Sequence, residues 1–153
     1  DEPEWKERAE KLAHKTREFT SFVADEFAKA GKLTPAAGKG IKITYHDSCH
    51  MRRGLNIYEQ PRELIKMLPG YEFVEMKDPD KCCGMAGAFG VKYADLSRPI
   101  LQAKITNIKN TGADIVAVAC PACQMQIQGG LDKQLPNVKV KHVAELLAEQ
   151  IKE

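Results

Sequence analysis

The run Ile115-Val116-Ala117-Val118-Ala119 has no polar side chain at any of its five positions. Successive side chains of a strand point to opposite sides of a sheet, so a strand that is apolar at every position must be covered on both faces. Sheets covered in this way are typically parallel, with helices on each side. The run therefore predicts a central strand of a parallel sheet in an α/β fold.

The rest of the chain alternates between strand-like and helix-like patterns. The other predicted strands cover residues 41–46, 71–76 and 138–142. The predicted helices cover residues 59–68, 95–110, 121–129 and 144–151. Helices that alternate with strands act as crossovers between parallel strands. The order predicts a Rossmann-like four-stranded parallel sheet with helices on both faces.

A long helix is predicted ahead of this sheet, from Glu4 to about Ala30, because apolar residues recur there at three- and four-residue steps. Gly31 ends it, and residues 34–40 have the composition of a linker. We therefore expect residues 1–40 to form a helix and linker, and residues 41–153 to form the domain that holds every cysteine. The sequence begins without Met, and we expect a fragment whose first helix packs against a domain outside it.

The charge pattern excludes several classes of partner. The 23 basic and 21 acidic residues leave a formal net charge of +2, and the basic residues are spread along the chain. No basic patch marks a nucleic-acid surface. No apolar run approaches the roughly 20 residues that span a bilayer, and the first residues lack the order of a secretory signal. We expect no nucleic-acid partner and no transmembrane segment.

Five cysteines follow the predicted strands closely. Cys49 lies just past the first strand, Cys82 and Cys83 follow the second, Cys120 ends the third, and Cys123 is in the next helix. The carboxyl ends of parallel strands meet at one edge of the sheet. The five thiols, which span 75 residues, are therefore expected to converge there. In a chain without a secretory signal, such thiols indicate a reducing compartment and metal or redox chemistry.

The cysteine motifs leave three chemistries open. Cys120-Pro121-Ala122-Cys123 places two sulfurs within reach of one metal at a helix start, where free N–H groups favour thiolates. Alone, it fits half a zinc site, part of an iron–sulfur site, or a dithiol. Cys82-Cys83 needs a bent loop if both sulfurs face one centre, and Gly84 and Gly87 supply that freedom. Zinc has four positions, so five candidate ligands favour a cluster, or a four-ligand site with a fifth thiol kept for another role.

The spacing reads C, 32 residues, CCG, 35 residues, CPxC. With its surroundings, this pattern resembles the cysteine-rich CCG domain of heterodisulfide reductase subunits and of the iron–sulfur subunits of glycolate oxidase, anaerobic glycerol-3-phosphate dehydrogenase and lactate-utilisation oxidases. The similarity covers about residues 41–147, and its details are closest to the lactate and glycolate oxidase subunits. The matching segments are Thr44–His50, Arg53-Gly54, Pro61–Leu64, Cys82–Gly87 and Cys120–Gln126.

The resemblance implies an iron–sulfur cluster as the cofactor, a [4Fe–4S] assembly that is non-cubane in the heterodisulfide reductase relatives. The implied ligands are Cys49, Cys82, Cys83, Cys120 and Cys123. Relatives usually carry two CCG domains, often after a ferredoxin-like domain, and this chain resembles the C-terminal one. Residues 41–153 are then the cluster-binding domain. Zinc is the alternative metal, since some relatives hold it in such a domain.

The implied function is electron transfer in an oxidoreductase complex, from a flavin subunit toward quinone or another acceptor. The implied partners are flavin-containing or other iron–sulfur subunits and the rest of the parent chain. We expect a cytoplasmic location, with a peripheral contact at the inner face of the cytoplasmic membrane also open. The alternatives are a heterodisulfide or disulfide reductase with the cluster at its active site, and a structural zinc or metal-free docking module.

Several further residues are candidates for contacts around the cluster. His46 and His50 flank Cys49 and are expected to hydrogen-bond a sulfur or carry protons, with helix capping or packing as the alternative. Arg53 lies in the matched motif and is expected to offset the charge of the cluster. Gly84 and Gly87 are expected to bring backbone N–H groups near sulfur. No acid–base pair, phosphate loop or flavin fingerprint is present, so we expect a component of an oxidoreductase rather than a complete catalyst.

Overall fold

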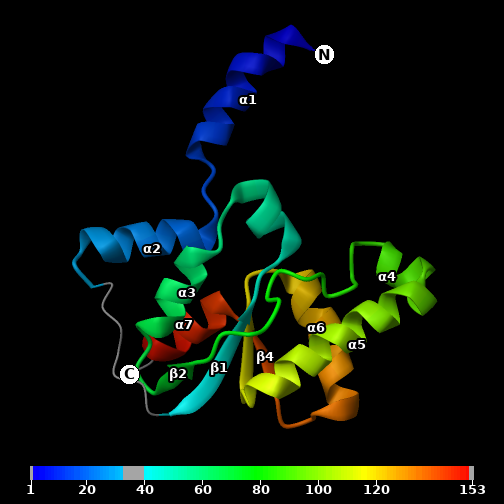
Figure 1. The fold of residues 1–153 in the computed structure, drawn as a ribbon. Helices are drawn as coiled ribbons and strands as arrows, with labels where there is room; N and C mark the ends of the chain where they lie inside the picture. The colour runs from blue at the N-terminus through cyan, green and yellow to red at the C-terminus, as the bar shows by residue number, and fades with distance from the viewer. Residues whose placement is uncertain (1, 33–39, 152–153) are drawn as a thin grey trace.

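The computed structural model describes residues 2–32 and 40–151. Its strands are β1 (Ile41–His46), β2 (Tyr71–Phe73), β3 (Ile115–Val118) and β4 (Lys139–His142). Its helices are α1 (Pro3–Lys15), α2 (Phe19–Lys29), a π-helical turn η1 (His50–Leu55), α3 (Glu59–Lys66), α4 (Phe89–Lys92), α5 (Ala94–Thr111), α6 (Pro121–Gln134) and α7 (Val143–Ile151). The α/β prediction is confirmed (Figure 1).

The four strands form one parallel sheet in the order β2-β1-β3-β4. The chain moves outward from β1 to β2 through α3, and then returns to the other side of β1 to form β3. The winding direction therefore reverses between β1 and β3. In open α/β sheets this switch point leaves a crevice beyond the carboxyl ends of the two strands, and ligands bind there.

Helices cover both faces of the sheet, as predicted. Alternate residues of β3 enter different cores, with Ile115 and Ala117 on one side and Val116 and Val118 on the other. The first core is closed by α2, α3 and α7, and the second by α5 and α6. All four of these β3 side chains are buried. The apolar run therefore has the two-sided burial that its sequence predicts.

The N-terminal helix is present but is divided into two pieces. α1 ends at Lys15, Thr16 has an extended backbone, and α2 begins after Glu18. The Glu18 carboxylate accepts hydrogen bonds from the Ser21 backbone N–H at 2.9 Å and from the Thr20 hydroxyl at 2.6 Å. This carboxylate caps a new helix start, which the continuous apolar periodicity does not reveal. Of the predicted linker, residues 34–39 lie outside the described residues.

The two N-terminal helices differ in their packing. α2 lies against α3, with Ala24 buried and Val23 and Phe27 packed on the first core. α1 buries no residue and projects away from the sheet (Figure 1). Among the helices of the described residues, none is long and apolar enough to cross a membrane.

Candidate metal centre

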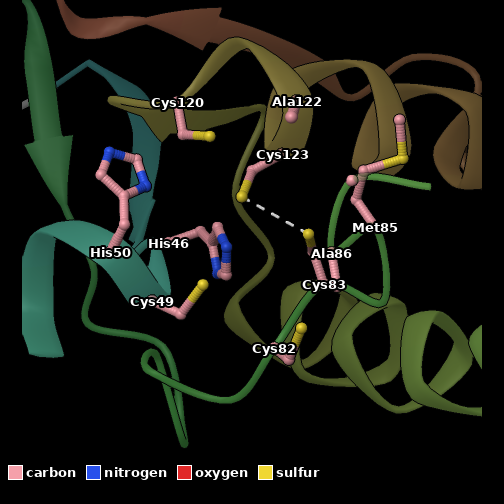
Figure 2. Close-up of a pocket in the computed structure, with 11 residues that line it drawn as sticks. His46, Cys49, His50, Cys82, Cys83, Met85, Ala86, Cys120, Ala122 and Cys123 are labelled. Carbon is pink, nitrogen blue, oxygen red and sulfur yellow. Dashed lines mark hydrogen bonds between the residues drawn. The ribbon is translucent and has the colours of Figure 1, made fainter. Parts of the chain in front are cut away.

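The five cysteines line one pocket of about 180 Å³ beyond the carboxyl ends of β1 and β3 (Figure 2). Cys49 follows β1, Cys82 and Cys83 lie in the loop between β2 and α4, and Cys120 is the N-cap residue of α6. Cys123 lies in the first turn of α6. The predicted convergence at one sheet edge is found, whereas ligation by these sulfurs stays a prediction.

The pocket has a buried end and an exposed end. Cys83 and Cys123 are buried, Cys82 and Cys120 are half-buried, and Cys49 is exposed. The buried end lies at the switch point of the sheet, between the two apolar cores. The five thiols are therefore not equivalent, because Cys83 and Cys123 are surrounded by protein whereas Cys49 is exposed to solvent.

The Cys82-Cys83 loop turns through a backbone that few side chains tolerate. Gly84, Ala86 and Gly87 have φ angles of +91°, +39° and +59°. A Cβ atom at Gly84 would lie 2.8 Å from the Ser97 carbonyl oxygen, so no side chain fits there without a shift of α5. The Gly84 N–H donates to the Cys82 sulfur at 3.2 Å. The loop thus brings a backbone donor to one of the pocket sulfurs, as its glycines predict.

Two side chains hold this loop against the neighbouring helices. The Ser97 hydroxyl of α5 donates to the Gly84 carbonyl at 2.9 Å and accepts from the Gln126 amide of α6 at 3.1 Å. The turn that carries Cys82 and Cys83 is therefore connected by hydrogen bonds to α6, the helix that Cys120 precedes and that contains Cys123. No sequence motif indicates that Ser97 connects this loop to α6.

Three potential ligand atoms gather at the buried end. A ring nitrogen of His46 and the sulfurs of Cys83 and Cys123 all lie within 4.8 Å of one another. The two sulfurs are 3.4 Å apart and share a hydrogen bond. That bond lowers the pKa of the Cys83 thiol, whereas the same bond and burial raise the pKa of the Cys123 thiol. The pair therefore loses its first proton readily and its second with difficulty.

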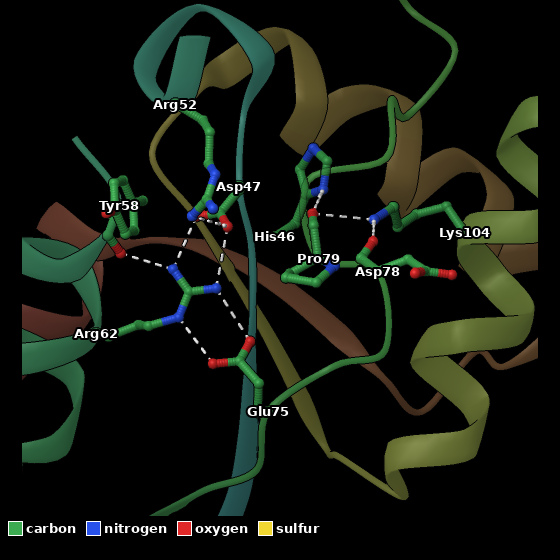
Figure 3. A network of polar contacts seen from close by, with 9 residues as sticks. All are labelled: His46, Asp47, Arg52, Tyr58, Arg62, Glu75, Asp78, Pro79 and Lys104. Carbon is green, nitrogen blue, oxygen red and sulfur yellow. Dashed lines mark hydrogen bonds and ion pairs between the residues drawn. The ribbon is translucent and has the colours of Figure 1, made fainter. Parts of the chain in front are cut away.

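The backbone carbonyl of Pro79 accepts three hydrogen bonds, and Figure 3 shows those from His46 and Lys104. The Pro79 oxygen lies 3.1 Å from the Asp47 backbone N–H, 3.2 Å from His46 Nδ1 and 3.1 Å from Lys104 Nζ. These contacts join the end of β1, the cysteine loop and α5 at one atom. The loop that precedes Cys82 is thereby fixed under the pocket.

Lys104 is the least expected residue near the site. It is 1% exposed, and its ammonium group donates to the carbonyls of Asp78 at 2.9 Å and Pro79. Burial lowers the pKa of Lys104 to about 8. A signal was available, since Lys104 lies at helical spacing from the buried Ser97 and Ile108, on the inner face of α5.

A buried arginine holds the segment before Cys49. Arg62 donates two hydrogen bonds to the Asp47 carboxylate, at 2.8 and 3.0 Å, and two to Glu75 at the same distances (Figure 3). A fifth goes to the Tyr58 carbonyl at 2.6 Å. The side chain of Asp47 is 1% exposed, so its charge depends on this pairing. Arg62 was part of the matched motif, but its role needed the structure.

Of the other residues predicted to lie near the cluster, the two histidines and Gly87 line the pocket and Arg53 does not. His50 and Gly87 line the pocket together with the cysteines, as His46 does. Arg53 is exposed and does not line the pocket. Its neighbour Arg52 is half-buried, 3.6 Å from the Asp47 carboxylate and stacked over the Tyr58 ring.

The residues present fit a sulfur-bound metal group. The donor set is dominated by thiols, which select soft metals and iron–sulfur clusters. Within the described part of the chain, the buried Nε2 atom of His46 has no hydrogen-bond partner, so it is available to bond a further atom. The pocket volume is also several times the roughly 30 Å³ share of one water molecule. A group larger than one ion is therefore compatible with the space.

Comparison with known proteins agrees with this chemistry. The family model of the CCG cysteine-rich domain matches residues 43–128, which include all five cysteines. The chain belongs to the CCG cysteine-rich domain family. The matched region of this CCG domain starts within β1 and ends within α6, so it contains the switch point and the pocket.

Individual relatives extend over almost all of the chain. It is 37% identical over 147 residues to lactate utilization protein A of Bacillus subtilis, covering 96% of this chain and 60% of that protein. It is 39% identical over 155 residues to the Exiguobacterium protein of the same name, covering 100% and 61%. It is 34% identical over 151 residues to the probable glycolate oxidase iron-sulfur subunit of Bacillus subtilis, covering 97% and 34%. The chain thus spans about 60% of the lactate utilization proteins that it matches.

The Arg62 pairing gives a stability prediction. Replacement of Arg62 by Met leaves the buried Asp47 carboxylate without its bidentate partner, and we expect a loss of about 3–5 kcal/mol in the free energy of unfolding. Denaturant unfolding of the reduced protein measures it. Arg53→Met, on an exposed side chain nearby, is the control and should change stability by less than about 0.5 kcal/mol. Equal effects of the two substitutions would contradict the proposed importance of the buried pair.

Lys104 gives a prediction for pH. Its pKa is about 8 in the folded protein and about 10.4 when unfolded, so between these values the unfolded chain binds more protons. The Lys104 contribution to stability must therefore rise as pH increases through this window. We expect the unfolding free energy of the wild type, relative to Lys104→Met, to gain about 2–3 kcal/mol from pH 7.5 to pH 10.5. The titrating groups that both proteins share cancel when their unfolding free energies are subtracted. A difference that does not change with pH would contradict the lowering of the Lys104 pKa by burial.

Proposed function

We propose that this CCG domain binds an iron–sulfur cluster and transfers electrons within an oxidoreductase complex. The observation that carries the proposal is the convergence of all five cysteines on one pocket at the switch point of the sheet. The printed names of two relatives, a lactate utilization protein and a glycolate oxidase iron-sulfur subunit, support the same class of reaction.

The proposed ligands are Cys49, Cys82, Cys83, Cys120 and Cys123, and the proposed cofactor is a [4Fe–4S] cluster. When bound, such a cluster supplies reversible one-electron transfer at a potential set by its ligands and surroundings. Five thiols exceed the four positions of a tetrahedral ion, which favours a cluster with several metal corners. The non-cubane form implied for heterodisulfide reductase relatives is part of this proposal.

The residues around the pocket have distinct tasks in this proposal. The Gly84 N–H, bonded to Cys82, stabilises negative charge on that sulfur, and the start of α6 does the same for Cys123. The two cores exclude water from Cys83 and Cys123, which limits loss of the cluster to solvent. The exposed end at Cys49 gives a partner protein close access, which electron transfer requires.

The proposed partners are a flavin-containing subunit, other iron–sulfur subunits and the rest of a longer parent chain. Residues 41–153 are proposed as the cluster-binding domain, with residues 1–40 as its N-terminal extension. The unpaired thiols fit a reducing compartment, so a cytoplasmic location is proposed, with a peripheral membrane contact through the partners.

Zinc is a second candidate for the metal, because one observation favours it. The His46 nitrogen and the Cys83 and Cys123 sulfurs lie close enough together to share one ion. With one more thiolate they would complete a tetrahedral zinc site. The pocket volume and the two remaining cysteines favour the cluster over a single ion.

Direct disulfide reduction is a second candidate activity. The exposed sulfur of Cys49 gives a disulfide access to the mouth of the pocket. Reduction of one disulfide to two thiols consumes two electrons and two protons, with the electrons supplied by a partner subunit. Addition of thiols or disulfides to the loaded protein should then change its electron paramagnetic resonance signal. An unchanged signal would leave electron transfer as the function of the domain.

Metal analysis under anaerobic conditions tests the main proposal. We expect iron and acid-labile sulfide in about equal amounts, and an electron paramagnetic resonance signal in one redox state. Replacement of each cysteine by Ser, one at a time, should lower the iron content by at least half. Met125→Ser is the matched control, since Met125 lies on α6 but is exposed outside the pocket, and it should keep the full content. One equivalent of zinc without iron or sulfide would overturn the proposal.

A further inference from the structure

His46 presents an unusual nitrogen to the buried end of the pocket. The residue ends β1, where it is paired with Val118 in the middle of the sheet, and it is 1% exposed. Its Nε2 atom is buried and has no hydrogen-bond partner among the residues that the structure describes. A buried polar atom without a partner is unfavourable, because it has lost its hydrogen bonds to water. Such an atom at the wall of a ligand pocket indicates that something bound in the pocket satisfies it.

The other ring nitrogen determines what this atom can do. Nδ1 lies 3.2 Å from the Pro79 carbonyl oxygen, and because a carbonyl only accepts, Nδ1 must carry the proton of this bond. In a neutral imidazole, Nε2 then has a free lone pair directed away from Pro79. Metal-bound histidines have this arrangement, with one nitrogen on the metal and the other donating to a carbonyl or carboxylate.

The Pro79 oxygen is itself held in place by the Asp47 N–H and the Lys104 ammonium group, at 3.1 Å each. The imidazole plane is therefore set by a carbonyl that has little freedom to move. Figure 2 shows the ring among the sulfur atoms of the pocket. The two helices that begin there, η1 and α6, have no side-chain hydrogen bond at their N-caps, so the ring caps neither of them.

The neighbours of Nε2 are the decisive observation. A ring nitrogen of His46 lies within 4.8 Å of the sulfurs of Cys83 and Cys123. Because Nδ1 is bonded to Pro79, Nε2 is the nitrogen with a lone pair free to join these sulfurs. Once these thiols are deprotonated for metal binding, three electron-pair donors face one another in a buried space. Three such donors repel one another unless a cation lies between them. The metal ions of a bound cluster would supply this positive charge.

We propose that His46 is a direct metal ligand through Nε2, adding a nitrogen to the five sulfurs of the site. This inference rests on the proposed function, because it requires a bound cluster. It predicts a mixed nitrogen and sulfur environment at the buried end. A neutral imidazole donates less negative charge than a thiolate, so histidine ligation favours the reduced state, as it does in other iron–sulfur centres with histidine ligands.

Isotope labelling tests this without changing His46. The chain has four histidines, at positions 14, 46, 50 and 142. Replacement of His14, His50 and His142 by Gln leaves His46 as the single site for ¹⁵N-histidine. After anaerobic reconstitution with iron and sulfide, pulsed electron paramagnetic resonance should detect a strongly coupled ¹⁵N nucleus. X-ray absorption at the iron edge, which does not depend on spin state, should show the scattering pattern of one imidazole.

Two variants serve as the matched pair. In otherwise unaltered protein, His46→Gln should remove both the ¹⁵N coupling and the imidazole scattering. His50→Gln, at the exposed end of the same pocket, should keep both signals. If His46→Gln does not fold, the triple variant still decides the question. A protein that holds iron and sulfide but shows no bound nitrogen in the His46-only chain would overturn the inference and leave the proposed function intact. A protein that takes up neither iron nor sulfide would instead overturn the proposed function.

Discussion

The parallel pairing of β1 with β3 is the constraint on which the site depends. Its register sets Ile43 opposite Ile115 and His46 opposite Val118, so both strands end at the same level. The chain then leaves the two strands in different directions, toward η1 and toward α6. A one-residue slip would exchange the faces of β1 and would turn the His46 side chain away from the pocket. The positions of Cys49, Cys120 and His46 therefore all follow from one ladder of backbone hydrogen bonds.

The cysteine loop is held to this ladder by polar contacts rather than by apolar packing alone. The Pro79 carbonyl accepts from β1 and from α5, and Ser97 connects Gly84 to α6. Each of these bonds joins segments that are far apart in sequence. Hydrogen bonds have preferred directions, so they fix the orientation of the loop more closely than contacts between apolar side chains would. A preorganised set of thiols loses less entropy when it binds a metal group.

Much of this arrangement could be predicted from the sequence, for reasons that particular residues make clear. The predicted bounds of β1 agree with the structure. Apolar and polar residues alternate from Ile41 to His46, and the segment is flanked by Gly40 and Asp47. The apolar run of β3 indicated two-sided burial, and parallel topology then placed the cysteines at one edge. Strand composition and helix periodicity are local properties, so a single sequence contains them.

The remaining features depend on contacts between distant segments. The break between α1 and α2 depends on a glutamate cap, and Glu is not a preferred N-cap residue. On α5 the apolar residues Leu96 and Ile100 are exposed, while the buried face carries Lys104. A lysine on the inner face is possible only because two carbonyls of the cysteine loop receive its ammonium group. The helical spacing of Lys104 from Ile108 indicates its face of α5, but no local pattern shows the two carbonyls that receive its ammonium group.

The difference in burial across the pocket connects the two proposals. At the inner end, His46, Cys83 and Cys123 lie between two apolar cores, where the low dielectric makes the charge of each ligand count most. A neutral nitrogen in that position reduces the negative charge that must be buried. At the outer end, Cys49 and His50 are exposed to solvent, where charge costs less and a partner can approach. Among the proposed ligands, the most buried residue, His46, is thus the one that would add no charge. The exposed residue Cys49 carries the sulfur best placed for the proposed exchange of electrons.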